Sequence, residues 1–301
     1  MATILLAEDS STHTALMRSL LEQDGHRVDC VVDGQLAWEG VQASRPDLIV
    51  TDLRMPDLNG CELVKKVVES DPDLPCIVVT ARGSEGLAVD ALAMGAANFV
   101  PKNSLHKLLN HVVRQTLAMS EVSAIFQQFS GHLESPEFSF ELPNEVAAIE
   151  PTVLYVMQTL AAATCLSMVE RIRVGAALSS ALFNAMCYGN LEIKDEDTVV
   201  SRMFSGDQSE HDELRERAVQ KPYCDRKVVL KVSVSKVDTR FFISHDGPGR
   251  MTRLTPAPGT SESFEIEQCR GFVLMTSFMD DIIFQSGNSS VVLVKSEAGL
   301  A

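Results

Sequence analysis

The sequence is short of aromatic residues and of positive charge. Aromatic side chains make up 6% of the 301 residues, and 26 Lys and Arg stand against 41 Asp and Glu, which gives a net charge of −15 at pH 7. A chain this acidic repels nucleic acid at long range, and no recognition-helix motif is present. We therefore expect protein partners and no nucleic-acid partner.

Long apolar runs and cysteine pairs are also missing. No run approaches the roughly 20 apolar residues that a membrane span needs, and Met1 leads into an apolar strand without a basic leader. The seven cysteines show no paired short spacing, which argues against a zinc site, and their odd number argues against a disulfide framework. We expect a cytoplasmic protein without membrane contact. Its length is typical of two domains.

Short apolar runs alternate with helical patterns over the first 120 residues. The runs are Thr3–Ala7, Arg27–Val32, Leu48–Asp52, Cys76–Thr80 and Asn98–Lys102. Each is followed by a segment with helical spacing, so the pattern predicts a doubly wound parallel sheet of five strands in the α/β class. Ligands of such sheets gather at the carboxyl ends of the strands.

The run that ends at Asp52 has two interpretations. The carboxylate either caps the next helix or lies in a site at the end of the sheet. The other strand ends favour the site, because they carry Glu8, Asp9, Thr80 and Lys102. Clustered carboxylates require a cation, and oxygen ligands favour Mg²⁺. The chemistry implied is attack of Asp52 on phosphorus to give an acyl phosphate, with Lys102 neutralising charge.

These motifs resemble the receiver domain of two-component response regulators over residues 1–119. The matching positions are Glu8-Asp9, Asp52, Thr80-Ala81 and Phe99-Val-Pro-Lys102. The resemblance implies that a sensor histidine kinase phosphorylates Asp52 and that Mg²⁺ is held in the acidic cluster of Glu8, Asp9 and Asp52 with the Arg54 backbone carbonyl. It also implies that Thr80 and Phe99 form the switch, although an aromatic residue in a strand is commonly part of the core. Asn103 stands where the family often has proline.

The rest of the chain predicts a linker over 120–137 and a second domain over 138–301. Strands are expected at Phe138–Leu142, 227–234, 239–244, 281–285 and 290–294, and helices at Val146–Met168, Ile172–Tyr188 and Phe272–Met279. Helices with an antiparallel sheet make an α/β sandwich. The polar stretch 192–222 is expected to be a solvated insertion.

The second domain resembles the nucleotide-binding domain of the GHKL (histidine kinase-like) ATPases, and more narrowly the anti-sigma-factor serine kinases. Asn184 in a helix, the turn Gly247-Pro-Gly249 and the helix start Arg270-Gly271 carry this resemblance. It implies that Asn184 coordinates Mg²⁺ beside ATP, that the turn approaches the adenine, and that Arg270 and Gly271 hold phosphate at a helix N-terminus. ATP is thus a candidate ligand.

Three departures from that family weaken the ATP site. Ser180 replaces the family's helix glutamate, and Cys269 replaces the first glycine of the motif at Arg270-Gly271. His245 replaces the aspartate that accepts a hydrogen bond from the adenine amino group. A serine cannot take a proton as a carboxylate does, and an unpaired buried donor costs about 1–3 kcal/mol. Two functions stay open: a switch that binds a protein partner of the anti-sigma or antagonist type, or an active serine kinase gated by the receiver. A homodimer through Ala88–Val113 is a further expectation.

Overall fold

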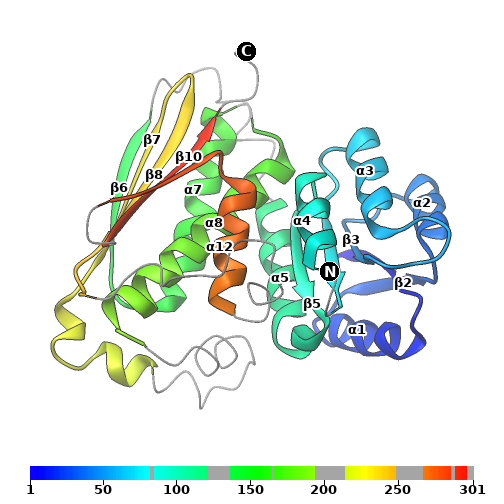
Figure 1. The fold of residues 1–301 in the computed structure, drawn as a ribbon, viewed down its shortest axis with the longest axis horizontal. Helices are drawn as coiled ribbons and strands as arrows, with labels where there is room; N and C mark the ends of the chain where they lie inside the picture. The colour runs from blue at the N-terminus through cyan, green and yellow to red at the C-terminus, as the bar shows by residue number, and fades with distance from the viewer. Residues whose placement is uncertain are drawn as a thin grey trace. The chain divides into compact units, whose positions relative to one another are not determined.

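The computed structural model describes residues 1–81, 85–120, 136–164, 166–193, 214–248, 267–285 and 289–296. The chain divides into two compact units, the first built mainly from Met1–Glu121 and the second from residues beyond it (Figure 1). Most of the predicted linker, 121–135, and much of the predicted polar insertion, 194–213, lie outside the described residues. The predicted domain limits therefore stay predictions.

The first unit contains a parallel sheet of five strands. The strands are β1 (Thr3–Ala7), β2 (Arg27–Val31), β3 (Leu48–Asp52), β4 (Cys76–Thr80) and β5 (Asn98–Pro101). Their order is β2-β1-β3-β4-β5, and every pairing is parallel. All residues of β3 and β4 are buried, as expected for inner strands covered on both faces. The predicted doubly wound parallel sheet of five strands is confirmed, and its strand order is flavodoxin-like.

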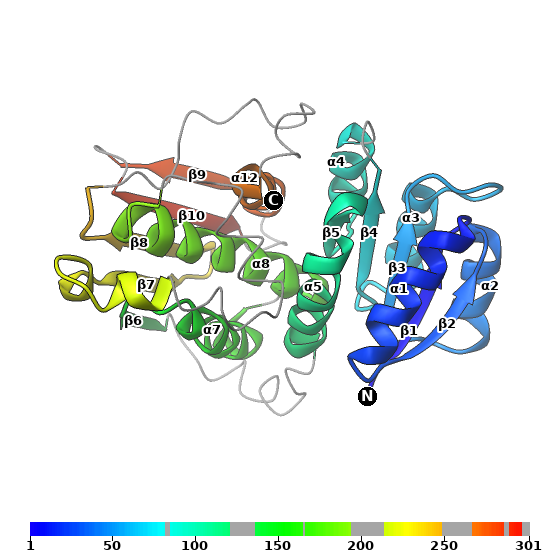
Figure 2. The same cartoon turned by 90° about the horizontal axis from the view of Figure 1, so that it is seen from below.

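Five helices connect and cover these strands. They are α1 (Ser11–Gln23), α2 (Gly34–Ala43), α3 (Gly60–Ser70), α4 (Glu85–Ala93) and α5 (Leu105–Ser120). α1 packs beside α5, and α3 packs between α2 and α4. Right-handed crossovers on a sheet of this order place the first pair on one face and the other three on the opposite face, and Figure 2 shows the sheet between them.

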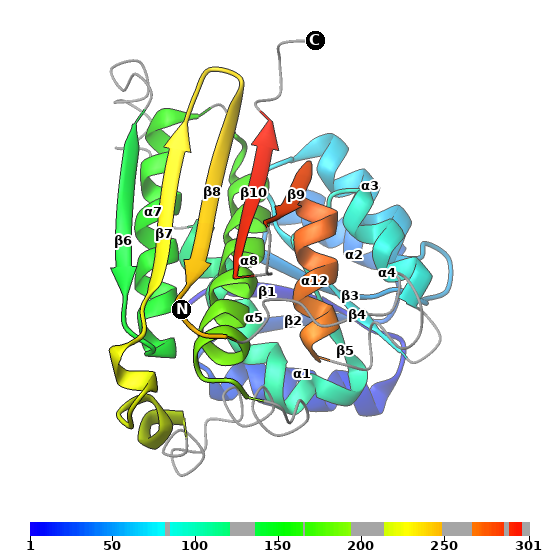
Figure 3. The ribbon, with the colours of Figure 1, turned by 60° about the vertical axis from the view of Figure 1, so that its left-hand side comes forward.

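The second unit contains an antiparallel sheet of five strands, ordered β6-β7-β8-β10-β9. The strands are β6 (Glu137–Leu142), β7 (Val228–Val234), β8 (Asp238–His245), β9 (Asp281–Phe284) and β10 (Ser290–Ser296). The helices α7 (Ile149–Ala163), α8 (Met168–Asn184) and α12 (Glu267–Phe278) lie against one face of the sheet (Figure 3). Inward side chains alternate along β7 and β8, so the core lies between the sheet and these helices.

The helices of this unit differ in their limits from the prediction. The predicted helix Val146–Met168 is a 3-10 turn, η3 (Val146–Ala148), followed by α7, which stops because Thr164 adopts extended backbone. α8 begins at Met168 rather than Ile172 and passes at its end into a π-helical turn, η4 (Ala185–Asn190). The apolar spacing runs through the break, so the sequence pattern did not reveal it.

One helical stretch in the described part of the chain is long and apolar enough to cross a membrane. It is Val146–Ala163, with a mean hydropathy of 1.4 and 44% of its residues buried inside the protein. Core helices of soluble proteins pass the same test, and Val153, Val156 and Leu160 on this helix are fully buried in the fold. The stretch is therefore weak support for a membrane span, and the cytoplasmic location stays a prediction.

Candidate functional site

The carboxyl ends of the parallel strands bring acidic and basic side chains together in the first unit. Lys102 Nζ lies 3.0 Å from Asp52 Oδ2 and 2.9 Å from Glu8 Oε1. Carboxylate oxygens of Glu8, Asp9 and Asp52 all lie within 4.8 Å of one another. Thr80 is the last residue of the neighbouring strand β4 and is buried. Residues separated by as many as 94 positions thus meet at one edge of the sheet.

Burial sets the electrostatics of this cluster. Burial of Glu8 and the nearby charge of Asp52 raise the pKa of the Glu8 carboxyl, against the opposing effect of Lys102. Burial alone lowers the pKa of Lys102, but its bonds to Glu8 and Asp52 outweigh this, and its pKa lies above the usual value. One ammonium therefore contacts two carboxyl groups, Glu8 and Asp52, and a third, that of Asp9, lies in the same cluster.

This cluster fits a divalent cation. Its donors are all carboxylate oxygens, which Mg²⁺ prefers, and Asp9 is exposed while Glu8 and Asp52 are buried. The Asp52 carboxylate is fixed in orientation because the Leu53 backbone N–H donates to its Oδ1 at 2.8 Å. Arg54 follows in the loop with an exposed side chain, and the ligand role of its carbonyl stays a prediction.

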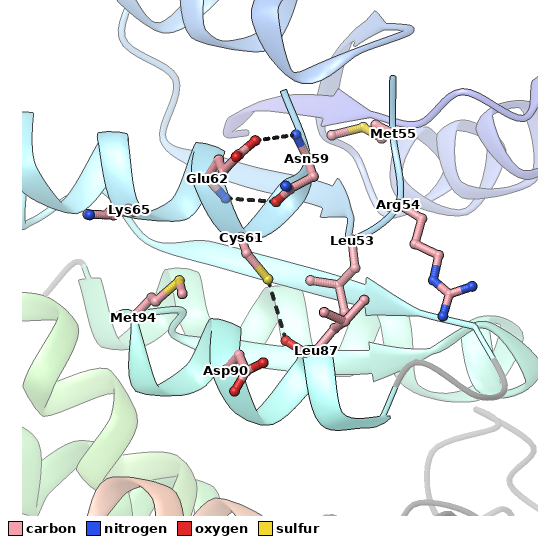
Figure 4. Close-up of a pocket in the computed structure, with 10 residues that line it drawn as sticks. All are labelled: Leu53, Arg54, Met55, Asn59, Cys61, Glu62, Lys65, Leu87, Asp90 and Met94. Carbon is pink, nitrogen blue, oxygen red and sulfur yellow. Dashed lines mark hydrogen bonds between the residues drawn. The ribbon is translucent and has the colours of Figure 1, made fainter. Parts of the chain in front are cut away.

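Asp52 does not cap the next helix. α3 begins at Gly60, and its cap is Asn59, whose Oδ1 accepts from the Glu62 N–H at 3.0 Å while Glu62 Oε2 accepts from the Asn59 N–H at 3.1 Å (Figure 4). A Cβ on Gly60 would overlap the Asp52 carbonyl oxygen. The loop therefore passes directly behind the strand end, and the capping interpretation of Asp52 is wrong.

The remaining predicted residues of this site lie on β5 and just after it. β5 ends at Pro101, so Lys102 begins a 3-10 turn, η1 (Lys102–Ser104), rather than ending the strand as predicted. Phe99 is fully buried in the core. Its burial agrees with the core interpretation, and its switching role stays a prediction.

A pocket of about 740 Å³ lies beside the acidic cluster, between α3 and α4. Its lining consists of Leu53, Arg54, Met55, Asn59, Cys61, Glu62, Lys65, Leu87, Asp90 and Met94 (Figure 4). Cys61 Sγ donates to the Leu87 carbonyl oxygen at 3.5 Å across this pocket. Sequence reasoning missed the pocket because two helices and a loop contribute to it. Leu87 on α4 and Met94 just after it are exposed apolar side chains of this lining, and the sequence pattern did not single them out.

Comparison with known proteins identifies this unit. Residues 4–114 match the family model of the response regulator receiver domain. Residues 4–114 are a response regulator receiver domain. Its acidic cluster is of the kind at which receiver domains bind Mg²⁺.

Individual relatives match the same part of the chain. The regulatory protein LuxO of Vibrio cholerae is 32% identical over 137 residues, covering 44% of this chain and 30% of LuxO. The DNA-binding transcriptional regulator NtrC of Azospirillum brasilense is 35% identical over 116 residues, covering 38% of this chain and 24% of NtrC. The chain thus spans less than a third of these relatives. A solved LuxR-family response regulator from Aurantimonas is 26% identical, covers 39% of this chain and 86% of its own, and has a TM-score of 0.37.

In the second unit, outside the receiver domain, two of the positions linked to ATP, Ser180 and Gly271, lie against each other. Ser180 Oγ donates to the Ala176 carbonyl oxygen at 2.9 Å, and a Cβ on Gly271 would lie 3.2 Å from Ser180 Cβ. Asn184 is buried at the end of α8. Gly249 and the side chains of Cys269 and Arg270 lie outside the described residues.

The turn at Gly247 is held by buried asparagines. Asn190 Oδ1 accepts from the Gly247 N–H at 2.8 Å, while its Nδ2 donates to Asn144 Oδ1 at 2.7 Å and to the Lys227 carbonyl at 3.0 Å. A Cβ on Gly247 would overlap the Gly189 carbonyl oxygen. Sequence reasoning missed this network because its members come from four separate segments.

His245 and Asp246 are both engaged inside the second unit. His245 is buried, and a Cβ on Gly189 would lie 2.6 Å from its ring, so the ring packs directly on that glycine. The Asp246 carboxylate accepts from the Lys227 backbone N–H at 2.8 Å. The aspartate one position away from the expected acceptor is therefore used to hold the strand end.

Proposed function

We propose that Asp52 accepts a phosphoryl group from a sensor histidine kinase. The observation that carries the proposal is the contact of Lys102 with both Asp52 and Glu8 in an oxygen-rich cluster. A carboxylate oxygen of Asp52 attacks phosphorus, a P–O bond forms, and the P–N bond to the kinase histidine breaks. The leaving imidazole nitrogen keeps the electron pair of that bond.

The other residues of the cluster stabilise the charge that develops on the transferred group. Glu8, Asp9 and Asp52 would hold Mg²⁺ with the Arg54 carbonyl, and the ion would neutralise phosphoryl oxygens when bound. Lys102 already touches Asp52 and keeps its proton, so its ammonium can donate to a phosphoryl oxygen. The Thr80 hydroxyl is the second donor, and with Phe99 it would report phosphorylation to the receiver surface.

The second unit, in this proposal, is a GHKL-like platform of the anti-sigma type that binds a protein partner and does not turn over ATP. Ser180 is a neutral residue whose hydroxyl donates to the Ala176 carbonyl of its own helix and whose Cβ lies close beneath Gly271. His245 packs on Gly189, and the Asp246 carboxylate is occupied by Lys227. Neither Ser180 nor His245 thus carries a carboxylate that could activate a hydroxyl or accept a hydrogen bond from adenine.

An active serine kinase is the second candidate function. Asn184 remains buried at the end of α8, and the glycine turn remains at Gly247, as in the ATP-binding family. If Asn184 and the turn at Gly247 still contact ATP, the unit binds Mg-ATP and transfers phosphate to a partner serine.

Calorimetric titration of the full chain with Mg-ATP separates these functions. We expect no binding heat at micromolar nucleotide and no labelling of captured partners by radioactive ATP. Micromolar binding that is lost in Asn184→Ala, together with transfer to a partner serine, would establish the kinase. A pull-down with and without beryllofluoride, with Asp52→Asn as control, tests whether the acyl-phosphate state changes partner capture.

A further inference from the structure

The ammonium of Lys102 has a third neighbour that does not belong to the acidic cluster. His13 Nδ1 lies 3.4 Å from Lys102 Nζ and 3.5 Å from Glu8 Oε1. An ammonium group has three N–H donors and no acceptor. The ammonium lies 2.9 Å from both oxygens of Glu8 and 3.0 Å from Asp52 Oδ2, and a hydrogen bond from it to His13 uses the lone pair of the imidazole Nδ1.

α1 fixes the place of this imidazole. His13 is the third residue of α1, and the next residue, Thr14, donates its hydroxyl to the Glu8 carbonyl at 3.2 Å and to the Ser10 carbonyl at 3.0 Å. These bonds tie the first turn of the helix to the end of β1. The ring is 39% exposed, so it lies at the rim of the site, where it reaches the ammonium from the solvent side.

The three acceptors of Lys102 behave differently during phosphotransfer. Asp52 loses a free oxygen when it takes the phosphoryl group, and Glu8 belongs to the carboxylates that would share a cation. His13 lies outside that set of carboxylates. Once both carboxylates are engaged, the imidazole still offers the flexible lysine side chain an acceptor.

We propose that His13 is a positioning residue for phosphotransfer, which holds the Lys102 ammonium within reach of the phosphoryl group on Asp52. This inference rests on the proposed role of Asp52 as phosphoacceptor. His13 acts through Lys102 and makes no bond to the transferred group.

The test compares three variants of the full chain. His13→Leu removes the acceptor, whereas His13→Asn keeps one, because its Oδ1 is the same number of bonds from Cα as the imidazole Nδ1. His106→Leu, at an exposed position on α5, is the control for replacing a histidine by leucine. The maximal rate of Asp52 phosphorylation by acetyl phosphate with Mg²⁺ is measured together with its half-saturation.

We expect His13→Leu to lower the maximal rate by about threefold to tenfold with unchanged half-saturation, since one long bond to a charged donor is lost. His13→Asn should recover most of the rate, and His106→Leu should match the wild type. Equal rates in the Leu and Asn variants, whether both normal or both reduced, would overturn the proposal.

A second measurement needs neither metal nor phosphate. The side-chain NH₃⁺ signal of Lys102, observed by ¹⁵N NMR, should be protected from solvent exchange in wild type and His13→Asn and broadened in His13→Leu. Unchanged protection in His13→Leu would contradict the contact. If wild-type Asp52 takes no phosphoryl group, the proposed function fails, while this signal still decides the role of His13.

Discussion

Replacement of Lys102 by methionine tests whether its ammonium compensates the buried carboxylates. The Lys102 side chain is 13% exposed, and its partners Glu8 and Asp52 are 0% and 6% exposed. Removing one partner of a buried ion pair costs about 3–5 kcal/mol, because the opposite charge is left uncompensated. We expect the lower end, about 3 kcal/mol, since this ammonium lies at the rim of the sheet.

Urea unfolding in metal-free buffer measures this loss. Trp38 is the chain's single tryptophan and lies on α2, so its fluorescence follows the receiver domain. Added Mg²⁺ should restore part of the stability, by about 2.7 kcal/mol when the free ion is at 100 times its dissociation constant. Mg²⁺ should also bind the variant more tightly, because no ammonium competes for the carboxylates.

Lys65→Met is the matched control for this substitution. Lys65 and its partner Glu69 are both 65% exposed and 3.9 Å apart, so the loss should be below about 0.5 kcal/mol. If Lys102→Met unfolds at the same urea concentration as Lys65→Met without metal, the ammonium does not balance buried charge and the reasoning is refuted.

Three further predictions concern other contacts. Gly60→Ala should lower receiver stability by about 1–3 kcal/mol and slow phosphorylation, because its Cβ would overlap the Asp52 carbonyl; normal urea unfolding and labelling would contradict this. Burial raises the pKa of Glu8, so the folded metal-free protein binds the proton of this carboxyl more tightly than the unfolded chain does. The free energy of unfolding should therefore fall as the pH rises through the raised pKa. In Glu8→Gln, the urea midpoint measured against pH should no longer show this fall. Asn190→Ala should lower the calorimetric melting temperature of the second unit by removing the acceptor of Gly247 and the donor to Asn144, at a cost of about 2 kcal/mol or more, whereas exposed Asn103→Ala should change little.

The receiver fold and its acidic edge could be predicted because both follow from local patterns. The inner strands β1, β3 and β4 are short apolar runs, and parallel pairing places all carboxyl ends at one edge. Asp52 and Lys102 therefore meet although 50 residues separate them. The convergence of these side chains was therefore predictable from the strand ends, while their chemistry stays a prediction.

His13 could not be predicted, because its role depends on the turn by which α1 leaves β1. A histidine in an amphipathic helix pattern does not show from the sequence which residues its side chain contacts. The break between α7 and α8 was missed for a related reason, since apolar spacing continues across Thr164. The asparagine network of the second unit depends on tertiary contacts, so Asn144 and Asn190 looked like ordinary turn residues.

The most direct test of the central claim is the mass of the full chain after incubation with acetyl phosphate and Mg²⁺. We predict the addition of one phosphoryl group, located on Asp52 by peptide mapping after borohydride reduction, lost in Asp52→Asn and strongly reduced in Lys102→Met. A wild-type protein that stays unlabelled, or one labelled equally in Asp52→Asn, would contradict the account.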